Sequence, residues 1–68
     1  MYVAKTHSYT NSLALVCALR AAGVDAHTLD PMLGMEGVVI NPECEHQART
    51  ALTICRQHRT HMFEVETV

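Results

Sequence analysis

A chain of 68 residues has room for one domain and not for a multidomain enzyme. Hydrophobic residues make up 49 % of it, too many for a disordered chain, and aromatic residues only 4 %, so the core must be built mainly from aliphatic side chains. The formal net charge of −2 is not the charge of a nucleic-acid-binding domain, which is basic with clustered Lys and Arg. We therefore expect a single domain, residues 1–68, that binds no nucleic acid.

The first half of the chain predicts a strand, a helix and a second strand. Met1–Lys5 is β-prone, and the polar stretch Thr6–Asn11, rich in helix-capping residues, leads into an apolar helix expected over Ser12–Ala22. Gly23 then fits the position after a helix, where glycine is favoured. Alternating polar and apolar residues predict the second strand over Val24–Leu29.

The second half predicts a strand, a helix and a strand again. The β-branched run Val38–Ile40 predicts the third strand. Asn41 as N-cap and Pro42 at the first helical position predict the start of a second helix that runs to about His58. The alternation of Met62–Val68 predicts a fourth strand.

This β-α-β-β-α-β order is typical of the ferredoxin-like α+β fold. Right-handed crossovers place both helices on one face of a four-stranded antiparallel sheet, with the expected strand order 4-1-3-2. The two-residue period of strands divides the apolar residues between the two faces. Those expected to face the helices are Val3, Val38, Ile40, Phe63 and Val65. Those expected on the open face are Tyr2, Ala4, Val39, Met62 and Glu64.

Apolar residues exceed what one small core can hold, which predicts a homo-oligomer or an unidentified protein partner. The first helix is apolar nearly all round, as is typical of a helix buried on more than one side. The connection between the second and third strands carries methionines, which suit adaptable protein contacts, although it could instead fold back over the sheet edge. The candidate partner-binding residues are Tyr2, Met32, Leu33, Met35, Val39 and Met62.

The polar stretch before the first helix is the candidate small-molecule site. Backbone N–H groups at a helix N-terminus favour anions, and a tyrosine there could stack on a ring. Helix capping alone explains the same residues, so both interpretations stay open. The candidate ligand-binding residues are His7, Ser8, Tyr9, Thr10 and Asn11.

The three cysteines, an odd number, argue against a secreted disulfide framework and favour the reducing cytoplasm. Cys17, Cys44 and Cys55 fall at apolar positions of helical patterns, where a free thiol packs as a small hydrophobe. The alternative is a site for zinc or another transition metal formed by Cys55, His58 and His61. No CxxC or HExxH motif supports that alternative, and we expect no cofactor.

The sequence predicts neither an enzyme nor a membrane protein. A cysteine nucleophile needs a histidine and an orienting group within reach, and no such set is expected around Cys17. The first residues are expected to form a strand rather than a signal peptide. The longest apolar run, Leu13–Leu19, is far shorter than the roughly 20 residues of a membrane span.

Two stretches resemble a known family. Leu19–His27 is similar to its pattern of a leucine, two or three residues, Gly-Ile/Val and a strand. Val39–Glu43, followed by Ala48–Leu52, is similar to its pattern V-x-P-E, four residues, A-R-x-x-L. The chain thus resembles, over most of Met1–Leu52, a family of prokaryotic signal-transducing proteins with a PII-like, ferredoxin-like fold and no established biochemical role.

The resemblance has two departures, which are Leu13–Leu15 in place of an acidic pair early in the first helix and a shorter connection between the second and third strands. No ligand residue of the PII proteins is carried over, because nothing in 30–37 matches their long nucleotide-binding loop. The resemblance implies a bacterial, non-enzymatic binding or regulatory module that takes part in signal transduction. Such a module would contact a protein partner or a small metabolite.

Overall fold

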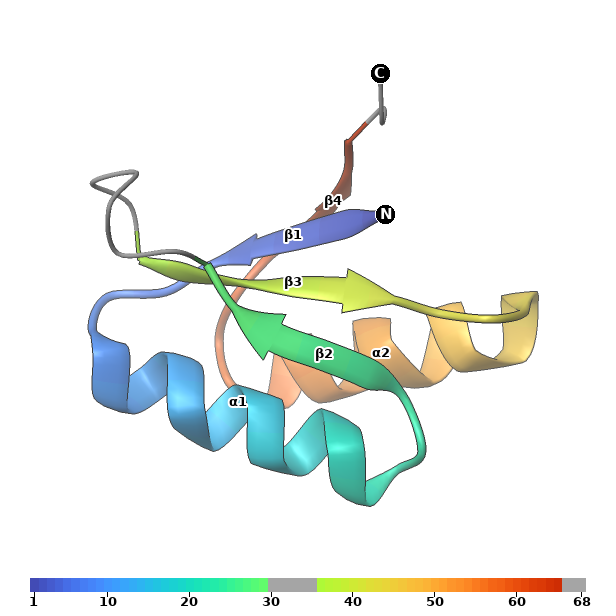
Figure 1. The fold of residues 1–68 in the computed structure, drawn as a ribbon, viewed down its shortest axis with the longest axis horizontal. Helices are drawn as coiled ribbons and strands as arrows, with labels where there is room; N and C mark the ends of the chain where they lie inside the picture. The colour runs from blue at the N-terminus through green and yellow to red at the C-terminus, as the bar shows by residue number, and fades with distance from the viewer. Residues whose placement is uncertain (30–35, 66–68) are drawn as a thin grey trace.

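The structure, a computed structural model, describes residues 1–29 and 36–65. Its elements follow the order β1 (Tyr2–Lys5), α1 (Tyr9–Ala21), β2 (Asp25–Thr28), β3 (Gly37–Asn41), α2 (Glu45–Gln57) and β4 (Met62–Glu64). The strands form one antiparallel sheet in the order β2-β3-β1-β4, and both helices lie on one side of it (Figure 1). The predicted ferredoxin-like α+β fold and its strand order are confirmed.

Helix α1 begins three residues before the predicted start. Ser8 is its N-cap, and the Ser8 side chain accepts a hydrogen bond of 3.1 Å from the backbone N–H of Asn11. Ser12, expected as the first helical residue, is buried within the first turn, where its hydroxyl lies 2.6 Å from that of Thr6. The N-cap of α1 therefore lies in the middle of the polar stretch rather than at its end.

Helix α2 begins later than predicted, which corrects the assignment of Asn41 as its N-cap. Asn41 is the last residue of β3 and pairs with Asp25 of β2, so the sheet takes the residue that the sequence assigned to the helix. The N-cap is Cys44. Just before it, the backbone N–H of Glu43 donates to the side chain of Gln47 over 2.8 Å.

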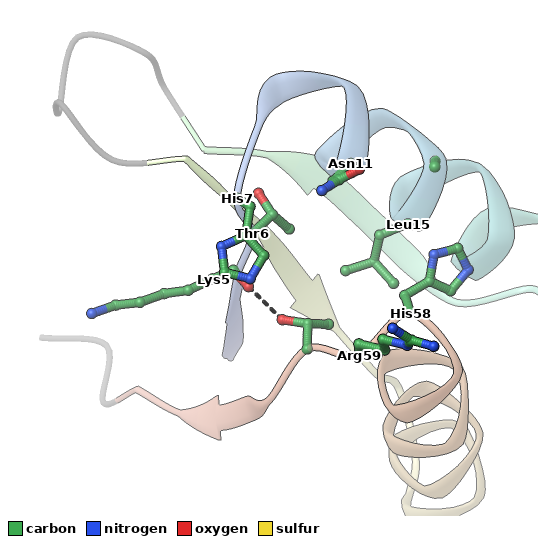
Figure 2. Close-up of a pocket in the computed structure, with 9 residues that line it drawn as sticks. Lys5, Thr6, His7, Asn11, Leu15, His58 and Arg59 are labelled. Carbon is green, nitrogen blue, oxygen red and sulfur yellow. Dashed lines mark hydrogen bonds between the residues drawn. The ribbon is translucent and has the colours of Figure 1, made fainter.

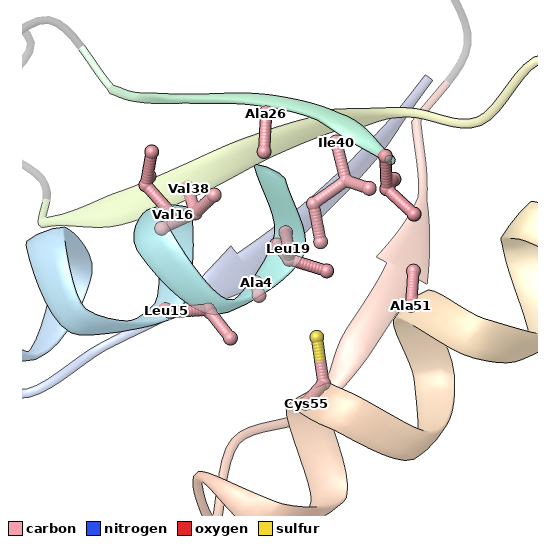
Figure 3. Packing of buried hydrophobic residues seen from close by; sticks show 10 residues of the cluster. Ala4, Leu15, Val16, Leu19, Ala26, Val38, Ile40, Ala51 and Cys55 are labelled. Atoms are coloured by element: carbon pink, nitrogen blue, oxygen red, sulfur yellow. The ribbon is translucent and has the colours of Figure 1, made fainter. Parts of the chain in front are cut away.

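The core lies between the sheet and the two helices, and its side chains are aliphatic, as the composition predicts. Leu15 and Leu19 of α1 point into the buried space that the sulfur of Cys55 of α2 also enters (Figure 3). The buried cluster consists of Ala4, Leu15, Val16, Leu19, Val24, Ala26, Val38, Ile40, Ala51 and Cys55. The prediction that all three thiols pack as small hydrophobes is wrong for Cys17 and Cys44, which are exposed.

The predicted faces of β1 are reversed. Ala4 pairs with the buried Val38 and belongs to the core, whereas Val3 pairs with Val39 on the face away from the helices. Tyr2 packs against the core as well. Each face of β1 carries apolar residues, so alternation alone does not decide which face lies against the helices.

The predicted faces of β4 are reversed for the same reason. Met62 packs against the core, and Phe63, which lies opposite Val3 and is 38 % exposed, points away from it. Val39 lies on the open face as predicted. Val65 follows the strand, and its N–H donates to the carbonyl oxygen of Met1 over 2.9 Å.

Several predictions fall outside the described residues. These are the partner-binding candidates Met32, Leu33 and Met35 and the end of the fourth predicted strand, 66–68. Within the described parts of the chain, no helix has the length and apolar character needed to cross a membrane.

Candidate functional site

The loop from β1 to α1 lies against the end of α2. The Thr60 hydroxyl, just after α2, donates a hydrogen bond to the carbonyl oxygen of Lys5 at the end of β1 (Figure 2). On the other side of the loop, the Thr6 hydroxyl lies 2.6 Å from the Ser12 hydroxyl and 3.3 Å from the carbonyl oxygen of Ser8. The Thr60 bond links the two segments, which are distant in sequence, and the Thr6 contacts fix the loop itself.

Between the two segments lies a hollow of about 100 Å³. The buried Leu15 contributes apolar surface to it, and most of the remaining lining is polar. The lining residues are Lys5, Thr6, His7, Asn11, Ala14, Leu15, His58, Arg59 and Thr60.

The side chains around this hollow are hydrogen-bond donors and positive charges. The imidazoles of His7 and His58 lie on either side of Leu15, and the Lys5 side chain runs outward from the hollow (Figure 2). The guanidinium of Arg59 carries a permanent charge, whereas each imidazole gains one when it is protonated. Among the described lining residues there is no carboxylate. The hollow is therefore suited to a small anion.

Arg59 enters the hollow from an unusual backbone conformation. Its φ of +57° lies in the left-handed region, and it is the only residue other than glycine with a positive φ among those described. The Arg59 N–H donates to the carbonyl oxygen of Arg56 over 3.0 Å, and the Thr60 N–H donates to that of Cys55 over 2.9 Å. This bonding is the Schellman motif, in which glycine is the usual residue at the left-handed position.

The structure brings two of the five predicted ligand-binding residues to the hollow. His7 and Asn11 line it. Ser8 is instead the N-cap of α1, while Tyr9 and Thr10 are exposed elsewhere. For Ser8 the capping interpretation of the polar stretch therefore holds.

Sequence reasoning missed the residues that come from the end of α2, namely His58, Arg59 and Thr60. The signal that could have found them is topological. Helices on one face of this fold run in opposite directions, so the start of α1 meets the end of α2, as Figure 1 shows. Combining the predicted fold with the basic residues after the second helix would have placed them beside His7.

The three residues of the metal alternative point in different directions. Cys55 is fully buried with its sulfur in the core (Figure 3), and this burial raises the pKa of its thiol to about 11. A metal binds the thiolate, which burial disfavours. His58 lines the hollow and His61 is exposed. In residues 1–29 and 36–65, no group of three or more His, Cys, Asp or Glu side chains is placed to hold a metal ion.

The opposite end of β1 and α2 has the opposite charge. A shallow surface of about 270 Å³ there is lined by Tyr2, Pro42, Glu43, Cys44, Glu45 and Ala48. A hydrogen bond from Tyr2 to Glu64, the negative charge of Glu64 and partial burial together raise the pKa of Tyr2. Glu45 pairs with Arg49 over 2.8 Å, with both side chains largely exposed. This end of β1 and α2 therefore carries acidic side chains, one of which is paired with an arginine.

Comparison of the chain with protein-family models, with curated proteins and with solved structures finds no match. The resemblance to the prokaryotic signal-transducing family therefore remains a prediction from the residues.

Proposed function

We propose that this chain is a non-enzymatic binding module of a regulatory, signal-transducing kind, and that it recognises a small metabolite through an anionic group. The single observation that carries the proposal is the hollow between the β1–α1 loop and the end of α2. Arg59, His7, His58 and Asn11 surround it, and none of its described lining residues is acidic. The net charge of the chain is negative, so the meeting of Lys5 and Arg59 at a hollow without acidic lining residues is local.

The size of the hollow limits what it can hold. Pockets that enclose a whole drug-sized ligand have volumes of about 300–1,000 Å³, whereas this one has about 100 Å³. It therefore admits one charged group, and the rest of the metabolite would lie outside, where a partner protein can reach it. Such a shared ligand is a simple way for a small module to report a metabolite to a partner.

The hydroxyl groups at the hollow support binding rather than catalysis. Those of Thr6 and Thr60 are engaged with Ser12, Ser8 and the Lys5 carbonyl, where they join the walls of the site. Neither threonine hydroxyl is therefore set up as an activated nucleophile, which would need an adjacent general base.

The proposal is tested by titrating the ¹⁵N-labelled chain with small anions and following its amide resonances. We expect saturable shifts at His7, Asn11 and Arg59, and none at the acidic end near Glu45. Arg59→Gln removes a charge from the hollow, and the matched control Arg56→Gln removes the same charge from an exposed position outside it. If the two variants respond alike, or if no anion gives saturable shifts, the site is not the one proposed.

The proposal also includes self-association through α1. Its outward side exposes Leu13, which is 43 % exposed, together with Ala14, Cys17 and Ala21. Exposed apolar surface of this kind is common at protein interfaces. We expect light scattering with size exclusion to give a mass above that of one chain, and Leu13→Lys to lower it. A one-chain mass at millimolar concentration would contradict self-association.

We place the module in the cytoplasm. Cys17 and Cys44 are exposed free thiols, and exposed unpaired thiols persist in a reducing compartment. Fractionation of the source cells, with the chain detected by a specific antibody, tests this placement.

A further inference from the structure

We propose that the anionic group held in the hollow is a phosphoryl dianion and not a carboxylate. This inference rests on the function proposed above and names its ligand class. Three observations carry it, namely the directions from which donors approach, the number of positive groups and the backbone conformation of Arg59.

The donors approach the hollow from two separate segments. His7 comes from the β1–α1 loop and Asn11 from the first turn of α1, whereas His58 and Arg59 directly follow α2 (Figure 2). A carboxylate has two oxygens in one plane, and a single guanidinium can satisfy both of them. A phosphoryl group has three terminal oxygens that point in different directions. Donors on facing walls of the hollow therefore suit a phosphoryl group better than a carboxylate.

The positive groups are also more numerous than one carboxylate needs. Arg59 is permanently charged, Lys5 stands at the edge of the hollow, and the imidazoles of His7 and His58 add further N–H donors. A phosphate monoester carries a charge of about −1.5 to −2 near pH 7. Because the described lining contains no carboxylate, nothing in it offsets these groups.

The walls are held in place before a ligand arrives. The Thr60 hydroxyl ties the end of α2 to the Lys5 carbonyl, and the Thr6 hydroxyl ties the opposite wall to Ser12. Walls that are already in place leave only the donor side chains to be ordered on binding, which favours affinity for a group that fits between the walls.

The conformation of Arg59 supports a specific role for its guanidinium. A left-handed residue at the end of a helix is usually glycine, and an L-residue with a side chain is disfavoured there. A planar guanidinium can donate two parallel bonds to neighbouring phosphoryl oxygens, which a lysine ammonium cannot. Arg59→Lys keeps the positive charge and a side chain at this left-handed backbone position. It removes only the pair of parallel guanidinium bonds.

Isothermal titration of the full chain with inorganic phosphate and with acetate, at one pH near 7 and one ionic strength, tests the inference. We expect phosphate to bind at least about tenfold more tightly than acetate. Arg59→Lys should weaken phosphate binding by about tenfold, the loss expected for one charge-assisted hydrogen bond. Arg56→Lys, the control outside the hollow, should leave it unchanged. Circular dichroism verifies that both variants fold.

The outcomes separate this inference from the proposed function. Acetate that binds as tightly as phosphate and shifts the same amides would overturn the phosphoryl assignment and leave the anion-binding function standing. Equal phosphate affinity in Arg59→Lys and Arg56→Lys would also overturn the assignment. Failure of both anions to bind would overturn the inference and the proposed function together.

Discussion

The two helices of this protein end in the same backbone motif, built from different residues. After α1, Gly23 has a φ of +82°, its N–H donates to Arg20 and the N–H of Val24 donates to Leu19. After α2, Arg59 has a φ of +57°, and its own N–H and that of Thr60 make the equivalent bonds. Among the described atoms, none lies within 4 Å of where a Cβ of Gly23 would be. The first end thus uses glycine for its backbone conformation alone.

The difference between the two helix ends indicates the role of the residue at each left-handed position. A glycine would satisfy the backbone at position 59 as it does at position 23, and the left-handed conformation disfavours an L-residue by about 1–2 kcal/mol. The arginine is therefore not explained by the fold. It is explained by the hollow, because the same turn directs residues 58–60 toward the start of α1.

The largest loss of stability is expected from truncating the buried residue that lies one turn before the C-terminal end of each helix. Leu19→Ala removes a fully buried leucine and should lower the free energy of unfolding by about 2–5 kcal/mol, enough to leave much of so small a domain unfolded. Cys55→Ala removes a single sulfur atom and should cost less. Urea denaturation followed by circular dichroism measures both, and equal midpoints would contradict this order.

The buried thiol at the end of α2 predicts a loss of stability at alkaline pH. Burial raises the pKa of Cys55 from 9.0 to about 11, so the unfolded chain releases this proton at lower pH than the folded one. The free energy of unfolding should therefore fall as pH rises from about 9 to about 11, by up to about 2 kcal/mol.

The control for this pH dependence is Cys55→Ala. The pKa of Tyr2 is also raised, beside Glu64, and contributes a slope of the same sign in both proteins. The Cys55→Ala variant should therefore keep only a shallower slope. An unchanged slope in that variant would show that the thiol does not carry the effect.

Making the end of α1 resemble that of α2 should destabilise the fold. Gly23→Ala places an L-residue in the left-handed region and should cost about 1–2 kcal/mol, a fall in Tm of several degrees for a domain of this size. Asn tolerates this region better, so Gly23→Asn should recover part of the loss. Because no described neighbour is close, steric clash adds nothing, and equal Tm values for Gly23→Ala and the native chain would contradict the comparison.

The element order and the glycine after α1 are readable from local chemical signals in the sequence, and the strand order follows from the fold that this element order predicts. The faces of β1 are not readable in this way, since Val3 and Ala4 are both apolar and only pairing with β3 decides between them. The start of α2 is misread because a sheet partner outweighs the capping preference of Asn41. In the site, His7 and Asn11 lie in a recognisable polar stretch, whereas Arg59 joins them only through tertiary structure.

The most direct test of the account is the thermal unfolding of Arg59→Gly with and without phosphate. Glycine should relieve the left-handed strain and raise the free energy of unfolding by up to about 1 kcal/mol in the absence of ligand. Phosphate, which stabilises any folded state that binds it, should raise the Tm of the native chain and leave that of Arg59→Gly nearly unchanged. A variant that is less stable than the native chain, or one that phosphate stabilises equally, would contradict the claim that Arg59 is present for binding.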